Sequence, residues 1–87
     1  MIYYPIYLNL QNRSCVVVGG GTIAEGKVNG LLEAEARVTV IAPEATEGVA
    51  ELAHQGRITW QARLYKPGDL AGASLAISAT DDRGVNT

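Results

Sequence analysis

Three consecutive glycines, Gly19 to Gly21, stand between a run of apolar residues and a segment with helical spacing. Together with Ala24 they match the pattern G-x-G-x-x-G/A, in which Gly19 and Gly21 take the two glycine positions. The first glycine permits a tight turn, and the second lets the backbone approach a pyrophosphate without a Cβ in the way. The small Ala24 lets the next helix lie close to the strand, and the helix N-terminus offers N–H donors to phosphates. The turn predicts a dinucleotide site; the alternative is a glycine-rich turn without a ligand.

The end of the second expected strand indicates which dinucleotide this turn favours. Pro43 and Glu44 follow that strand, close to where an acidic residue accepts a hydrogen bond from the adenosine ribose. Glu44 either takes that role or lies in the first turn of the next helix, where the helix dipole favours a carboxylate. This stretch supplies no Arg for a 2′-phosphate, so we expect NAD rather than NADP. A P-loop is excluded because no Lys-Ser/Thr pair follows the glycines.

The elements that must position these residues alternate between apolar runs, typical of buried parallel strands, and stretches of helical spacing. We expect strands over 15–18, 37–42, 57–61 and 74–79, helices from Thr22 and over 44–55, and a single helical turn over 69–72. This alternation predicts an α/β fold, a Rossmann-type doubly wound parallel sheet with strand order 3-2-1-4. We expect this sheet to be truncated after its fourth strand, so that residues 1–87 are the incomplete N-terminal part of an NAD-binding domain.

Composition and charge exclude several classes of function. A chain of 87 residues makes one small domain, and its net charge of −2 provides no basic stripe for nucleic acid. No apolar run approaches the roughly 20 residues that cross a bilayer, and the N-terminus lacks a secretory signal. The single cysteine excludes an internal disulfide and fits a reducing compartment. We therefore expect a soluble, cytoplasmic domain without nucleic-acid or membrane partners.

The remaining residues of reactive type predict structural roles. His54 stands near the end of a helix, which it could stabilise as a cation, and it has no partner His or Cys for a metal. Cys15 opens a buried strand and is expected to be a core residue rather than a nucleophile. Asp81 and Asp82 are adjacent, so a turn or cap role is favoured over paired acid–base carboxylates. We therefore expect no metal site and assign no catalytic residue.

Short motifs along the whole chain carry a resemblance to a known family. These are Tyr4-Pro5-Ile6-Tyr7-Leu8, Cys15 to Gly21, Ala24-Glu25-Gly26-Lys27, Ala36 to Val40, Gly56-Arg57-Ile58, Ala79-Thr80-Asp81-Asp82 and Val85-Asn86. Together they resemble the N-terminal module of siroheme synthase, a family of precorrin-2 dehydrogenases that are often also sirohydrochlorin ferrochelatases. The triple glycine followed by Lys27, with Ala-Thr-Asp-Asp further on, is more specific than the glycine pattern alone.

The resemblance implies NAD-dependent oxidation of precorrin-2, a tetrapyrrole, to sirohydrochlorin in siroheme biosynthesis, with homodimers of the full-length protein and a possible ferrochelatase activity. It places the cofactor over the glycine turn, the end of the second strand and the end of the fourth. The expected cofactor-binding residues are Gly19, Gly21, Thr22, Ile23, Pro43, Glu44, Thr80 and Asp81. The aspartate proposed for catalysis in the family would lie beyond Thr87, so the chain is expected to hold the cofactor but to lack that group.

Two departures from the family pattern bear on stability. Glu35 stands where the family usually has glycine, and a positive φ there would cost Glu roughly 1 kcal/mol. The family prefers larger residues at Gly26 and Gly30, so we expect a less stable first helix.

Two other functions remain open from the sequence. A regulatory NAD-sensing module, such as the nucleotide-binding domains attached to potassium transporters, would share the glycine turn, but Thr80-Asp81-Asp82 and Val85-Asn86 argue against it. Tight nucleotide binding without tetrapyrrole affinity would favour that module. A scaffold without a cofactor is the third possibility, supported if Gly21→Val left all ligand binding unchanged.

Overall fold

The computed structural model describes residues 10–79, which form a four-stranded sheet and two helices. The elements are β1 (Ser14–Val18), α1 (Thr22–Glu33), β2 (Arg37–Ile41), α2 (Glu47–His54), β3 (Thr59–Gln61) and β4 (Leu75–Ser78). All the strand pairs are parallel and the order is β3-β2-β1-β4. The predicted α/β fold and the 3-2-1-4 strand order are confirmed.

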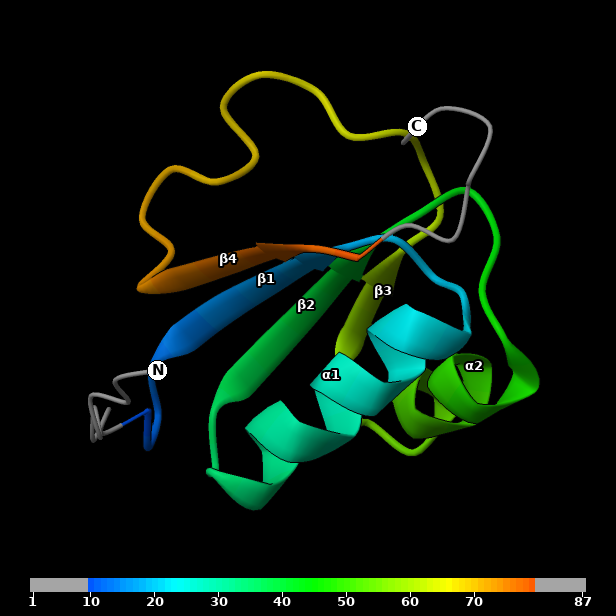
Figure 1. Cartoon of the computed structure of the whole chain (residues 1–87), viewed down its shortest axis with the longest axis horizontal. Helices are drawn as coiled ribbons and strands as arrows, with labels where there is room; N and C mark the ends of the chain where they lie inside the picture. The colour runs from blue at the N-terminus through cyan, green and yellow to red at the C-terminus, as the bar shows by residue number, and fades with distance from the viewer. Residues whose placement is uncertain (1–9, 80–87) are drawn as a thin grey trace, which may run out of the picture.

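The sheet carries its helices on one face (Figure 1). α1 packs on β1 and β2, and α2 packs beside it against β3. The connection between β3 and β4 arches over the opposite face, so the two crossovers on either side of β1 run on different faces (Figure 1). This arrangement is typical of a doubly wound sheet, which changes the direction of its strand order at β1.

The core lies between the helices and the sheet face that they cover. Cys15 and Val17 of β1 and Val38 and Val40 of β2 alternate toward it, and each is at most 4% exposed. These four meet small or branched side chains of the helices: Ala24, Val28, Leu31 and Val49. Burial raises the pKa of the Cys15 thiol, which favours the uncharged form. Cys15 is a core residue, as predicted.

Three of the expected elements differ from the structure by more than one residue. α2 begins at Glu47 rather than Glu44, because Thr46 is its N-cap and accepts a hydrogen bond from the Val49 N–H at 3.2 Å. β3 begins at Thr59, two residues later than expected. Residues 69–72 form turns rather than a helical turn, with Gly72 at φ +82°.

The connection from α1 to β2 requires a left-handed residue, and Glu35 supplies it with φ +64°. The Glu35 N–H donates to the Leu32 carbonyl, and the Ala36 N–H donates to the Leu31 carbonyl, so these bonds close the helix. The positive φ expected at this position is therefore present, at a cost of roughly 1 kcal/mol for a side chain other than glycine.

We predict that Gly30→Ala stabilises the chain. A Cβ at Gly30 would meet no atom within 4 Å, and glycine inside a helix costs about 1 kcal/mol relative to alanine. The free energy of unfolding should rise by up to about 1 kcal/mol, which raises Tm by about 4–8 °C in a domain of this size. Thermal and urea unfolding followed by circular dichroism measure the change.

Gly56→Ala is the matched control. Its Cβ also meets open space, but Gly56 has φ +79°, a conformation that disfavours alanine. Gly56→Ala should therefore destabilise the chain where Gly30→Ala stabilises it. The same sign of change in both variants would contradict this reading of α1.

Candidate functional site

A groove of about 530 Å³ opens where the carboxyl ends of the strands meet. Its walls are the glycine turn after β1, residues 41–44 at the end of β2, Leu64 and Tyr65 of the β3–β4 connection, and Ala79 after β4. Open α/β sheets bind ligands in a crevice at this edge, at the point where the strand order changes direction.

The glycine turn forms the floor of the groove. Gly19 has φ +125°, which a residue with a Cβ rarely adopts, and its N–H donates to the Ile41 carbonyl at 3.0 Å. Gly21 is the N-cap of α1, and its carbonyl accepts the Glu25 N–H at 2.9 Å. The turn therefore joins the end of β1 to the start of α1 while staying hydrogen-bonded to β2.

The middle glycine holds the turn against the loop that follows β2. A Cβ on Gly20 would collide with the backbone carbonyl oxygen of Glu44, and would lie 2.9 Å from the Ala45 Cα and 3.1 Å from the Ala42 Cβ. The Gly20 carbonyl accepts the Thr46 N–H at 2.9 Å. The G-x-G-x-x-A pattern treats this position as variable, so the pattern gave no role to Gly20. The signal for its role was the presence of glycine at this middle position as well as at the two positions that the pattern requires.

The two helices differ at their N-termini. The side chain of Thr46 caps α2 and also donates to Glu25 Oε1 at 2.7 Å. The N-cap of α1 is Gly21, which has no side chain to cap the helix. The Glu25 carboxylate is bonded to Thr46, while the positive end of the α1 dipole faces the groove from the glycine turn, which favours an anion there.

The loop after β2 forms the second wall of the groove. Pro43 and Glu44 line it and are exposed. Glu44 precedes the Thr46 N-cap, so it is not in the first turn of α2, and that alternative for its role was wrong. The loop is anchored below these residues because Trp60 Nε1 donates to the Ala42 carbonyl at 2.9 Å.

The structure brings together half of the predicted site residues. Gly19, Gly21, Pro43 and Glu44 all line the groove. Thr22 and Ile23 begin α1 directly after the turn and are exposed, but they are not among the lining residues. Thr80 and Asp81 lie outside the described residues.

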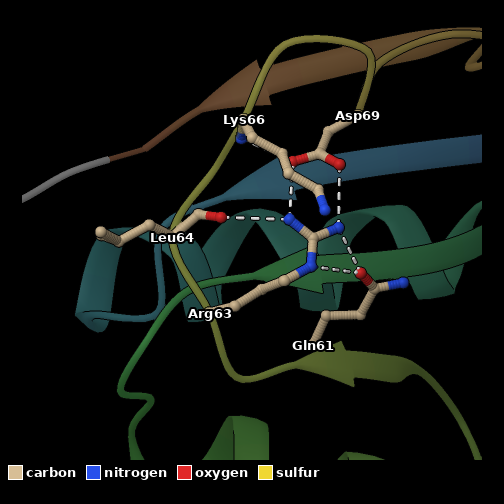
Figure 2. A network of polar contacts seen from close by, with 5 residues as sticks. All are labelled: Gln61, Arg63, Leu64, Lys66 and Asp69. Carbon is tan, nitrogen blue, oxygen red and sulfur yellow. Dashed lines mark hydrogen bonds and ion pairs between the residues drawn. The ribbon is translucent and has the colours of Figure 1, made fainter.

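A polar network shapes the third wall. Arg63 contacts both carboxylate oxygens of Asp69 at 2.8 Å and also bonds Gln61 Oε1 and the Leu64 carbonyl (Figure 2). Asp69 also accepts the Lys66 N–H at 2.7 Å. The hydrogen bonds from Arg63 and then from Lys66 lower the pKa of Asp69 to about 2. Nothing in the spacing of Leu64 and Tyr65 along the sequence indicates a site, so neither residue was predicted to line the groove.

Residues 10–79 contain no group of three or more His, Cys, Asp or Glu side chains that could hold a metal ion. None of their helices has the length and apolar character needed to cross a membrane.

The chain is similar to known proteins over nearly its whole length. The family described as "Putative NAD(P)-binding" matches residues 6–87, nearly the whole chain. The chain belongs to this NAD(P)-binding family. The expected cofactor type is thereby confirmed at the level of the family.

The relatives of this chain include siroheme synthases. The chain is 48% identical over 82 residues to siroheme synthase of Methylobacillus flagellatus, covering 94% of this chain and 18% of that protein. It is 46% identical over 86 residues to siroheme synthase 3 of Aeromonas hydrophila, covering 99% of this chain and 18% of that protein. The resemblance seen in the sequence motifs is confirmed.

A solved structure agrees with this relationship. SirC, a precorrin-2 dehydrogenase, superposes with a TM-score of 0.86 at 34% identity, over 97% of this chain and 42% of SirC. The chain therefore spans less than half of SirC and about a fifth of the two siroheme synthases.

We predict that Gly20→Ala destabilises the chain by about 1–3 kcal/mol, as overpacking does in a close contact. The added Cβ meets the Glu44 carbonyl, which is backbone and cannot rotate away. Urea unfolding measures the loss. The control is Gly26→Ala, whose Cβ meets nothing within 4 Å and which should stabilise the chain as Gly30→Ala does. A Gly20→Ala variant at least as stable as the native chain would show that the loop does not need this close approach.

Proposed function

We propose that this chain is the NAD-binding part of a precorrin-2 dehydrogenase, which oxidises precorrin-2 to sirohydrochlorin. The observation that carries the proposal is the groove over the glycine turn, with the uncapped N-terminus of α1 at one side and Glu44 at the other. The likeness to siroheme synthases and to SirC supports the choice of substrate. Nothing in the groove or among the relatives favours the regulatory NAD-sensing alternative.

The residues of the groove fit a dinucleotide. Gly21 puts no side chain between the turn and a ligand, and the α1 dipole favours phosphate at this point. The volume of about 530 Å³ lies in the range of small-molecule sites. When bound, NAD⁺ supplies the hydride acceptor for the oxidation.

The chain's own residues bind and orient that cofactor. The backbone at Gly21 and the first turn of α1, which includes Thr22 and Ile23, would hold the pyrophosphate. The Glu44 carboxylate would accept a hydrogen bond from the adenosine ribose and repel a 2′-phosphate, which favours NAD over NADP. Thr80 and Asp81 remain predicted contacts at the end of β4.

We assign residues 1–87 to the cofactor-binding part of a longer enzyme, because they match only 42% of SirC. The groups that react with precorrin-2, including the aspartate that the family resemblance implies, would then come from outside this stretch. A homodimer of the longer protein, a ferrochelatase activity and a cytoplasmic location stay predictions.

Calorimetric titration with NAD⁺ tests the proposal. The variant is Gly21→Val: Gly21 has φ −85° and ψ −164°, an extended conformation that valine adopts without strain. The valine side chain would stand over the N-terminus of α1, where the pyrophosphate approaches. We expect saturable binding by the native chain and loss of binding in the variant. Valine is a poorer N-cap residue than glycine, so the Tm of the variant should fall, and both chains are titrated at a temperature at which circular dichroism shows them folded. Equal binding by both chains would contradict the assignment of the glycine turn.

The preference for NAD over NADP gives a second prediction. Glu44→Ala should weaken NAD⁺ binding about tenfold, because a hydrogen bond to a charged group is lost. It should also reduce the difference between the affinities for NAD⁺ and NADP⁺. Titration of both nucleotides measures this change. Glu47→Ala removes an exposed carboxylate in the first turn of α2, outside the groove lining; if it has the same effect, the preference comes from net charge and not from Glu44.

A further inference from the structure

The large apolar side chains that are exposed within residues 10–79 gather around the groove. They are Ile23 at 51% exposure, Leu64 at 74% and Tyr65 at 44%. Leu64 and Tyr65 line the groove, and Ile23 lies in the first turn of α1 beside the glycine turn. Exposed apolar side chains that cluster at one cavity indicate a surface that a ligand or partner covers.

The segment that carries Leu64 and Tyr65 is braced from both ends. Arg63 ties it to Gln61 at the end of β3, and the two-point contact between Arg63 and Asp69 closes the turn behind it (Figure 2). The Lys66 N–H donates into the same carboxylate. Such paired, planar contacts restrict the geometry of the segment. Two exposed apolar residues are thus held in place by a polar network that contributes nothing to the core.

The wall formed by Leu64 and Tyr65 faces the same groove as the loop after β2. Leu64 and Tyr65 follow β3, which pairs with β2 through Thr39 to Ile41, and Pro43 and Glu44 follow β2. All four residues line the same groove. The adenine is joined to the ribose that Glu44 would hold, and Leu64 and Tyr65 are the large apolar residues exposed in that groove.

Tyr65 also lines a second pocket, of about 220 Å³, with Val18, Leu70 and Ile77. Its side chain thus borders two cavities. An aromatic ring placed between an apolar pocket and an open groove offers a flat base an apolar surface to pack on.

We propose that Leu64 and Tyr65 form the wall on which the adenine of NAD packs, and that Arg63 and Asp69 are positioning residues that hold this wall in its bound geometry. The inference rests on the proposed function and deepens it. A wall that is already ordered loses little freedom when the ligand binds, so the brace favours affinity without touching the ligand.

The test compares the two halves of the cofactor. Titrations of the native chain and of Tyr65→Ala use NAD⁺, 5′-AMP and nicotinamide mononucleotide. Truncating an aromatic that stacks on a base weakens binding by about tenfold, so we expect that loss for NAD⁺ and 5′-AMP and no change for nicotinamide mononucleotide. Tyr65→Phe keeps the ring and should bind all three like the native chain.

Leu64→Ala is a second variant of the same wall, at a side chain exposed enough that folding does not depend on it. It should weaken 5′-AMP binding in the same direction as Tyr65→Ala. Tm values of all variants show that the chain is folded under the titration conditions.

Asp69→Asn tests the brace through a double-mutant cycle with Tyr65→Ala. If Asp69 acts by positioning Tyr65, its replacement weakens 5′-AMP binding in the native background and adds little once Tyr65 is alanine. Losses that simply add would show that Asp69 has only a structural role and would overturn that part of the proposal.

The outcomes separate the inference from the proposed function. Native binding of NAD⁺ with an unchanged 5′-AMP affinity in both Tyr65→Ala and Leu64→Ala overturns the adenine wall and leaves the cofactor assignment intact. A loss confined to nicotinamide mononucleotide places the other base on this wall and overturns the inference too. A folded native chain that binds no NAD⁺ overturns both.

Discussion

The close approach of the Gly20 backbone to the loop after β2 is the constraint on which the site depends. A side chain at Gly20 would occupy the position of the Glu44 carbonyl, and the Gly20 carbonyl accepts the Thr46 N–H. Thr46 then caps α2 and donates to Glu25 of α1. One glycine thereby couples the turn after β1, the loop after β2 and the starts of both helices, so the floor and one wall of the groove are fixed relative to each other.

Small side chains and close packing also explain how two helices on a small sheet leave the groove open. Val and Ala side chains make a thin core, and Gly48 lets α2 approach the Glu25 carboxylate, into which a Cβ would protrude. Close packing on the helical face keeps both helices behind the strand ends. The groove is left between backbone segments and the braced connection, and its lining combines the glycine backbone with the apolar residues Leu64 and Tyr65.

Local patterns were sufficient to predict the architecture. Apolar runs and helical spacing predicted the strands and their order, and the glycine pattern predicted the turn at Gly19 and Gly21. The omissions arise from contacts between distant residues, whereas the late start of α2 comes from a local contact, the Thr46 cap on the Val49 N–H. The roles of Gly20, Leu64 and Tyr65 follow from which loops meet at the strand ends. The spacing of residues along the sequence does not show which loops lie together at the strand ends.

The most direct test of the account is a titration of the ¹⁵N-labelled chain with NAD⁺, followed by the backbone amide resonances. The account predicts that the amides of Gly20, Gly21 and Ile23 shift together and saturate, while those of Asn12 and Glu35, which adjoin the opposite ends of β1 and β2, stay unchanged. Shifts confined to that opposite edge, or no shifts in a folded chain, would contradict a cofactor site over the glycine turn.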